Sequence, residues 1–211
     1  MSVTAFNPAG KPSSRVDEIP MPDVYERLKR SPDDPDGSVT YATATSQALA
    51  MVRVWPIPEG EWVMPLDDPQ SVIASIHEEH SDNQGLIAVE SAKTSSGARC
   101  IYSIVKTLLE PMGSGVQYTL TMHVEAEDGP VSVQGFFEEQ GMTGTREAMT
   151  MALTGRNGVD PMEGWFQDPY DAAHTRGVPM NLSESREYDE AWPDHPLTLY
   201  RAMAKHVKEV C

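Results

Sequence analysis

Hydrophobic and polar residues alternate most regularly between residues 85 and 139, where four apolar segments follow one another with turn residues between them. Alternation with a period of two is typical of β-strands, and short turns between strands are typical of antiparallel pairing. The pattern therefore predicts a four-stranded antiparallel meander. The segments 39–45 and 48–55 predict an earlier strand pair, which brings the sheet to about six strands.

The best-defined part of the meander is the hairpin formed by 116–125 and 131–138. An Asp128-Gly129 pair lies between the two strands, and Asp-Gly favours the centre of a two-residue type I′ turn. This turn predicts that His123 faces Gln134 across the hairpin. One hairpin face is apolar and must pack on a core, whereas the other is largely polar. The apolar face consists of Val116, Tyr118, Leu120, Met122, Val124, Val131, Val133 and Phe137.

Strands 86–91 and 100–109 are apolar on both sides, which predicts helical cover on both faces of the sheet. Asp67 or Asp68 can cap a helix that begins at Pro69 and runs to about Ser81. A second helix is expected after the turn at 141–144, with Ala148, Met151 and Ala152 as its buried side. A third begins near Pro196. Its apolar stripe is Leu197, Tyr200, Met203, Ala204 and Val207.

These elements predict an α+β fold in which an antiparallel sheet lies between helices as a three-layer α/β/α sandwich. We expect residues 1–37 to be a flexible N-terminal segment and 38–155 to form the core of sheet and helices. Residues 156–211 are expected to form an aromatic wrapping arm and a C-terminal helix that pack on the same domain. The arm is too rich in Gly and Pro for long regular elements and too aromatic for a disordered linker.

The net charge of −16 repels phosphate backbones and anionic lipid, so nucleic-acid and membrane-surface binding are disfavoured. A basic protein partner would be attracted, although acidity can also serve solubility alone. No apolar run reaches the ~18 residues of a membrane helix, and the N-terminus has no apolar signal core, so we expect a cytoplasmic protein. Cys100 and Cys211 make no disulfide framework.

Two local motifs are candidate sites for a metal or an anion. His77 and His80 are three residues apart, not the four of the zinc-protease pattern, so we expect a solvated helix face and no metal. Thr143, Gly144 and Arg146 precede a helix and could gather around an anion, but Arg146 could equally pair with a carboxylate. No signature of a nucleophile, a nucleotide or another cofactor is present.

The polar hairpin face is the remaining candidate binding surface. His123, Glu125, Gln134 and Glu138 lie on it, and an acid–base pair there is one interpretation. The other is a solvated face, because antiparallel sheets often show water one polar side. Trp165 and Tyr170 of the arm either complete this surface or anchor the arm along the edge of the core.

The order of elements resembles the Mog1/PsbP-like α/β/α sandwich family. The resemblance covers residues 39–155: a strand pair, a helix introduced by Asp67-Asp68-Pro69, and a long meander that ends in Val133-Gln134-Gly135-Phe136-Phe137 before a turn into a helix. It implies a non-catalytic binding or assembly module. The leading hypothesis is therefore a non-enzymatic protein that binds another protein through its acidic surface. The alternative is a small-molecule-binding protein or minor hydrolase with a pocket between the polar hairpin face and the arm.

Overall fold

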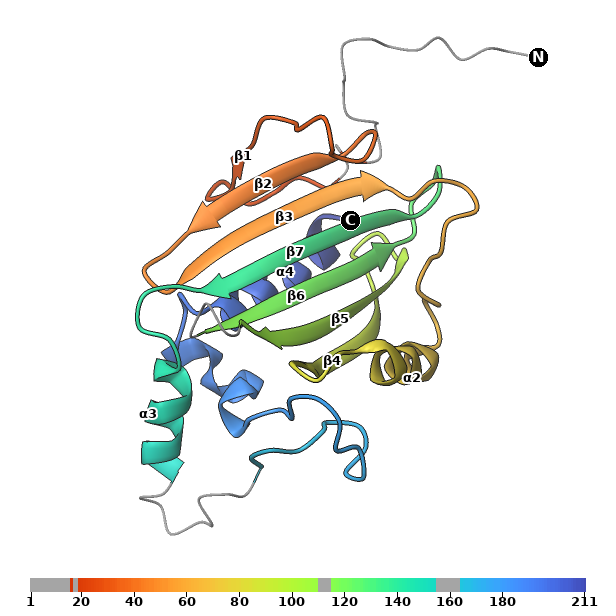
Figure 1. Cartoon of the computed structure of the whole chain (residues 1–211). Helices are drawn as coiled ribbons and strands as arrows, with labels where there is room; N and C mark the ends of the chain where they lie inside the picture. The colour runs from red at the N-terminus through yellow and green to blue at the C-terminus, as the bar shows by residue number, and fades with distance from the viewer. Residues whose placement is uncertain (1–15, 17–18, 110–114, 155–163) are drawn as a thin grey trace, which may run out of the picture.

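The centre of the molecule is a seven-stranded antiparallel sheet (Figure 1). The computed structural model describes residue 16 and residues 19–109, 115–154 and 164–211. The strand order is β1-β2-β3-β7-β6-β5-β4, so β3 pairs with β7 and the connection from β3 to β4 crosses to the far edge. The strands are β1 (Glu26–Arg27), β2 (Val39–Ala44), β3 (Ala48–Pro56), β4 (Gln84–Lys93), β5 (Arg99–Leu108), β6 (Val116–Val124) and β7 (Val131–Glu139).

The sequence predicts about six strands, and the seventh is the two-residue strand β1. It pairs with β2 through Glu26 and Arg27, which is too short to produce a periodic pattern. The range 1–37, expected to be flexible, thus includes β1, and it also includes Ile19, which is 3% exposed within the core. Residues 1–15 and 17–18 lie outside the described part of the chain.

Helix α4 (Pro196–Val210) covers one face of the sheet (Figure 1). The five residues of its predicted stripe are all buried, so both its start and its apolar face are confirmed. They pack on the predicted apolar hairpin face and on the inward residues of β3. The hydroxyl of Tyr200 also donates to the carbonyl of Ser103 at 2.6 Å. Full burial of a large apolar side chain stabilises the fold by about 1.5–3 kcal/mol. Because many such side chains are buried between α4 and the sheet, this interface is the main core.

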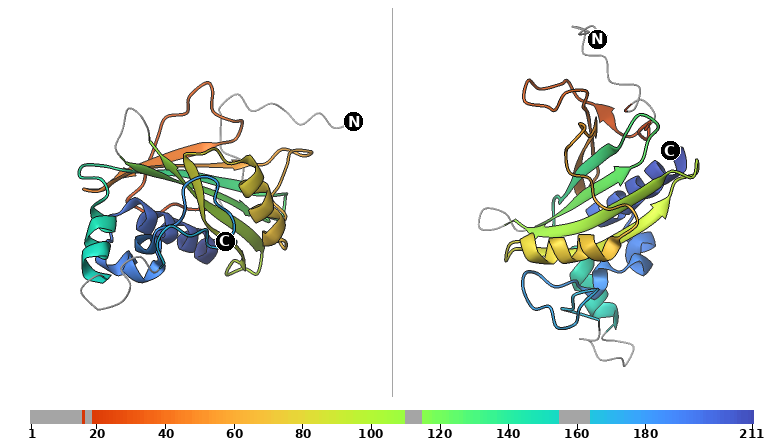
Figure 2. Two further views of the ribbon diagram at one scale, coloured as in Figure 1. Left: turned by 60° about the horizontal axis from the view of Figure 1, so that its bottom comes forward. Right: turned by 90° about the vertical axis from the view of Figure 1, so that its right-hand side faces the viewer.

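Helix α2 (Pro69–Glu79) lies on the opposite face from α4 (Figure 2). Asp68 caps it by accepting from the Ser71 amide at 3.1 Å, and Pro69 takes the first position as predicted. Val72 and Ile73 pack in a second apolar cluster with Leu86, Val89 and Ile101 of β4 and β5.

The α+β class is therefore correct, but α2 covers only the β4–β5 end of its face. Within the described residues, no helix lies over β2, β3 and β7 on that side (Figure 1). Helix α3 (Thr145–Thr154) lies beyond the end of the sheet and packs against the short 3₁₀ helix η1 (Leu182–Glu184).

The predicted buried side of α3 is wrong. Arg146 and Thr150 are its buried residues, whereas Met151 is 39% exposed and Ala148 and Ala152 are also exposed. The helical period cannot distinguish an apolar face from a polar one that finds buried partners. Arg146 finds such partners, because its guanidinium donates to the carbonyl of Ser183 at 2.6 Å and to Asp189 at 2.9 Å.

The predicted register of the β6–β7 hairpin is also wrong. His123 faces Ser132, and Gln134 faces Thr121. The amide of Gly129 donates to the carbonyl of Ala126 at 3.1 Å, so the turn spans Ala126–Gly129 and a longer loop follows the strand. Gly129 has a φ of 121°, but Asp128 is not in the left-handed region that a type I′ turn requires. A shift of two residues leaves every side chain on its predicted face, so the apolar face stays correct.

Residues 164–180 form a loop, here called the arm loop, that runs along the free edge of β4. Gln167 and Met180 pair with each other and close it, and the amide of Val178 donates to the carbonyl of Gln84 at 2.8 Å. The backbones approach so closely that a Cβ on Gly85 would lie 1.7 Å from the carbonyl oxygen of Val178. Such cover blocks a strand edge that could otherwise pair with another chain.

A buried ion pair joins the sheet to η1. Lys106 Nζ on β5 lies 2.8 Å from Glu184 Oε2, and both side chains are at most 2% exposed. The hydroxyl of Tyr118 donates to Glu184 Oε1 at 3.1 Å, and the amide of Asn181 donates to Oε2 at 2.6 Å. Burial raises the pKa of Tyr118 well above its usual value, so this hydroxyl stays protonated and remains a donor. The carboxylate thus has three donors in a site without solvent.

The longest helix in the described residues is α4, and none of the described helices has the length and apolar character needed to cross a bilayer.

Lys106→Met should lower the free energy of unfolding by about 3–5 kcal/mol, because it leaves the Glu184 carboxylate buried without its counter-charge. Urea denaturation measures this loss. Arg30→Met is the control, since Arg30 pairs with a fully exposed Asp36 and its removal should cost less than about 1 kcal/mol. Equal effects of the two substitutions would show that Lys106 and Glu184 are hydrated.

Gly85→Ala should displace the arm loop, because the added methyl group collides with backbone and not with a flexible side chain. We expect a lower melting temperature and faster proteolysis within 164–180. Gly115→Ala is the control, since its Cβ would meet side chains and no backbone, the nearest being Thr143 at 3.2 Å. If Gly85→Ala and Gly115→Ala were cleaved at the same rate, the close contact between the arm loop and β4 would be refuted.

Candidate functional site

The uncovered part of the sheet presents two rows of side chains to solvent. The first row runs Ala42, Met51, Phe136 and Thr119 across β2, β3, β7 and β6, and the second runs Ala44, Leu49, Glu138 and Gln117. We call these eight residues the open sheet face. They point away from α4, because side chains alternate along each strand and the intervening residues Ala50, Tyr118 and Phe137 are in the main core.

The open sheet face is apolar at its centre. Leu49 is 47% exposed and Met51 is 37% exposed, although their neighbours Ala48 and Ala50 are completely buried on the other side of the same strand. Phe136 lies directly opposite Met51 and is partly buried. Glu138 and Gln117 provide polar groups at the border. A small apolar centre with a polar border is the usual composition of a protein-binding surface.

The connection from β3 to α2 contacts β6 at His123, two rows beyond the open sheet face. Trp62 is 65% exposed and meets the ring of His123 edge-on, with ring centroids 5.9 Å apart. The amide of Met64 donates to Nδ1 of His123 at 2.9 Å. Burial lowers the pKa of His123 from 6.5 to about 4, so the ring is neutral at physiological pH. His123 therefore acts as a fixed acceptor that holds the connection against β6.

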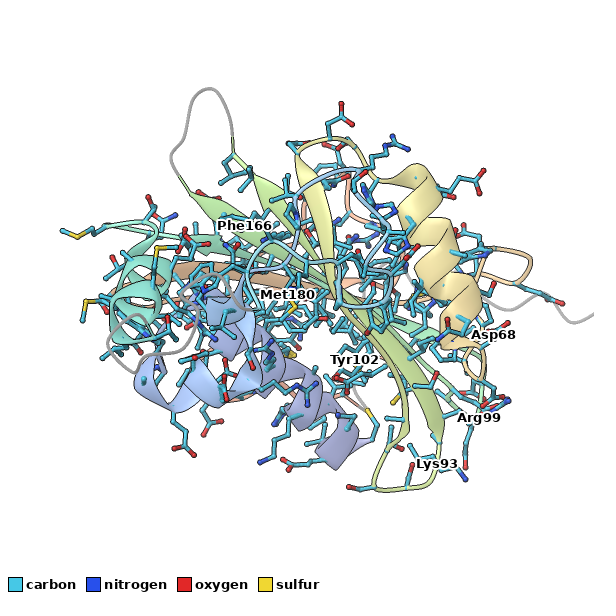
Figure 3. The ribbon with its side chains drawn as sticks, turned by 90° about the horizontal axis from the view of Figure 1, so that it is seen from below. Asp68, Lys93, Arg99, Tyr102, Phe166 and Met180 are labelled. Atoms are coloured by element: carbon cyan, nitrogen blue, oxygen red, sulfur yellow. The ribbon has the colours of Figure 1, made fainter. Side chains whose placement is uncertain are left out.

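The four hairpin residues of the predicted site do not converge. Glu138 is on the open sheet face and Gln134 is one row away, whereas His123 is closed over by Met64 and Trp62. Glu125 pairs with Arg99, whose hydrogen bonds lower the pKa of Glu125 to about 2. Arg99 also pairs with Asp67 at 2.6 Å, close to the start of α2 (Figure 3). No acid–base pair forms among these four side chains.

The predicted anion-binding residues are also separated. Arg146 is 2% exposed and donates into η1 and to Asp189, which matches the alternative that it pairs with a carboxylate. The amide of Gly144 donates to Glu139 Oε1 at 3.4 Å, so a carboxylate of the chain itself occupies the start of α3. Thr143 does not share a contact with Arg146 in the described residues. The helix start is therefore satisfied internally.

Trp165 and Tyr170 lie on the arm loop, away from the hairpin. Tyr170 anchors the loop, because its hydroxyl accepts from the amide of Val89 at 2.6 Å and donates to the carbonyl of Val89 at 3.1 Å. Trp165 is buried, and the neighbouring Phe166 is exposed on the loop (Figure 3). β4 and β5 separate the loop from β6, and in the described part of the chain the cavity lined by the arm loop includes no residue of the hairpin.

The arm loop instead brings two residues to α2 that the sequence did not indicate. Asp168 and His174 meet His77, and the three residues could hold a metal ion. A cavity of about 410 Å³ lies beside them, lined by residues of the arm loop, His80 and β4. The local spacing of His77 and His80 could not reveal this group, because the other residues come from about ninety positions further along the chain. The presence of histidine in the arm was the only signal available.

Comparisons with known proteins give only a weak structural resemblance. No protein-family model matches the chain, and no curated sequence matches it. Among solved structures, the fold is similar to the crystal structure of the Ran-binding protein Mog1p of Saccharomyces cerevisiae. The TM-score is 0.36 at 8% identity, over 65% of this chain and 75% of Mog1p. At this level the resemblance is weak and assigns neither a family nor a binding residue to the chain.

His123 should make the stability of the protein depend on pH. Its pKa is lower in the folded chain than in the unfolded chain, so only the unfolded chain binds a proton between pH 6.5 and pH 4. The stabilisation is complete above pH 6.5 and is lost as the pH falls toward 4. Between pH 7 and pH 4.5, the normal protein should lose about 2 kcal/mol more than His123→Asn, measured by urea denaturation. Parallel profiles for the two proteins would show that the ring is accessible to protons when folded.

Proposed function

We propose that this protein is a non-enzymatic binding module whose partner protein packs on the open sheet face. The observation that supports this most directly is the exposure of Leu49 and Met51 beside Phe136, on the part of the sheet that no described helix covers. Leaving apolar side chains in water costs free energy that a partner can recover by burying them. Strands that are buried on one side and apolar on both sides are therefore good candidates for a docking surface.

We further propose that the partner is basic around its contact surface. The net charge is −16, and the segment 57–79, which runs from the contact with His123 to the end of α2 beside Thr119, carries six carboxylates and no lysine or arginine. Trp62 stands in this segment and adds an exposed aromatic ring, a residue type enriched in interfaces. A basic border on the partner would speed association and select the correct orientation.

A protein is a better occupant than a small molecule for this surface. The rows of the open sheet face span four adjacent strands, and neither Leu49 nor Met51 lines the larger cavities found among the described residues. Small-molecule sites are typically concave and bury most of their ligand. The relationship to the Mog1/PsbP-like family and a cytoplasmic location remain parts of this proposal, based on the order of elements and on composition.

Site-specific photo-crosslinking can test the proposal. A photoreactive residue at position 51 should crosslink a basic protein from native lysate, whereas the same residue at position 149 should not. Met149 is a suitable control because it is 49% exposed and lies on α3, away from the sheet. The double variant Leu49→Thr/Met51→Thr should then weaken binding of the purified partner at least about tenfold, with strand propensity retained.

Met149→Thr should leave the affinity unchanged, and raising the salt from about 0.05 M to about 0.5 M should weaken binding further. If Leu49→Thr/Met51→Thr and Met149→Thr bound the partner with equal affinity, the open sheet face would be refuted as the binding surface. A crosslink from position 51 to a second copy of this chain would refute a heterologous partner and identify a dimer contact.

A further inference from the structure

The arm loop passes the end of α2 (Figure 2). Three histidines and one aspartate meet there. His77 is in the last turn of α2 and His80 is its C-cap residue, whereas Asp168 and His174 belong to the arm loop. One ring nitrogen of His77, one of His174 and a carboxylate oxygen of Asp168 lie within 4.8 Å of one another. The group is only partly exposed, which distinguishes it from chance pairs of charges on the surface.

The carboxylate of Asp168 is held in a fixed orientation. Its Oδ1 accepts from the amides of Tyr170 and Asp171, each at 2.9 Å. Its Oδ2 lies 2.9 Å from Nε2 of His77, and the two side chains are 7% and 14% exposed. One oxygen is therefore used by the backbone of the loop, and the other is directed at the histidines. Carboxylates that bind metals are commonly oriented in this way by outer hydrogen bonds.

Three ring nitrogens of this group have no hydrogen-bond partner among the described residues. The rings of His77 and His174 are stacked with centroids 4.0 Å apart, and His80 meets the ring of His174 edge-on at 5.2 Å. His80 is 5% exposed, yet neither of its nitrogens has a hydrogen-bond partner among the described residues. Nε2 of His174 is likewise buried without a partner. Unpaired buried polar atoms are costly and rare, so they indicate a missing ligand.

We propose that His77, His174 and Asp168 bind a divalent transition-metal ion, with Zn²⁺ as the best match. Imidazole nitrogen and carboxylate oxygen are the ligands that Zn²⁺ accepts in proteins, at about 2.0–2.2 Å. Ligand atoms around a tetrahedral ion at these distances are about 3.3 Å apart, so the set must contract on binding. A turn of the His174 ring out of its stack with His77 provides this contraction.

The site would have an open coordination position. Three protein ligands leave a fourth place on Zn²⁺, and Asp168, His174 and His80 all line the neighbouring cavity of about 410 Å³. The buried ring of His80 thus lines the same cavity as two of the proposed ligands. The ion would also join the arm loop to α2, two segments that are about ninety residues apart in the sequence.

Metal titration of the full chain tests the proposal directly. After treatment with a chelator, the protein should bind one Zn²⁺ per chain by calorimetry, and its melting temperature should rise as Zn²⁺ is added. Co²⁺ should bind competitively and give the intense visible absorption of tetrahedral coordination. Absence of saturable Zn²⁺ binding, or a Co²⁺ spectrum of octahedral type, would overturn the proposed metal site. Both results come from the unsubstituted protein.

Two substitutions identify the ligands. Asp168→Asn keeps the acceptor for the Tyr170 and Asp171 amides, and His77→Gln keeps a polar group toward Asp168. Each should weaken Zn²⁺ binding at least about tenfold. His206→Gln is the matched control, because His206 is a histidine on α4 that bonds only the carbonyl of Pro20 among the described contacts. Circular dichroism and melting in chelator verify that each variant is folded.

Unchanged Zn²⁺ affinity in folded Asp168→Asn and His77→Gln would place any bound metal elsewhere and refute the site. The result of the metal titration is independent of the open sheet face, since none of the four residues of the group lies on β2, β3, β6 or β7. These residues are His77, His80, Asp168 and His174. Binding of the partner protein can therefore fail while metal binding succeeds, or the reverse.

Discussion

The buried contact between Lys106 and Glu184 is the interaction on which the other parts of this structure depend. Lys106 lies on β5, between β4 and β6, and Glu184 belongs to η1 in the segment after α3, so the pair fixes that segment against the sheet. Arg146 of α3 and Arg201 of α4 bond the carbonyls on either side of this position, at Ser183 and Glu184. A buried charge tolerates few alternative arrangements, because any displacement leaves it unpaired in a medium of low polarity. Two helices and the arm thereby share a single anchor.

This anchoring determines which surfaces stay open. With α4 on one face and the arm loop held along the β4 edge, no described element remains to cover β2, β3 and β7 on the α2 side. The apolar side chains of β3 and β7 stay accessible there as a result. The same arm loop carries Asp168 and His174 to the end of α2. The proposed protein-binding surface and the proposed metal site are thus separate consequences of one packing arrangement.

Local elements were predictable where the signal lies within a few residues. Asp68 and Pro69 begin α2 as expected, and the stripe of α4 from Leu197 to Val207 is buried as expected, because capping and helical period are local properties. The apolar hairpin face was predictable for the same reason. The register was not, because the Asp128-Gly129 pair also fits the longer loop that the chain adopts. The burial of Arg146 was not predictable either, because the residues around an arginine in the sequence do not show whether distant segments will bury it.

The sequence by itself determined the six longer strands and the helices α2, α3 and α4, the antiparallel meander and the side of the hairpin strands that faces the core, since all of these follow from period and turn chemistry. Only the tertiary structure decided the pairing of β3 with β7, the partial cover of one sheet face and the meeting of His77 with Asp168 and His174. These features join segments that are tens of residues apart. Contacts between such distant segments produce no periodic pattern of hydrophobic residues in the sequence. Candidate sites made from distant segments therefore become visible only when the folded chain brings their residues together.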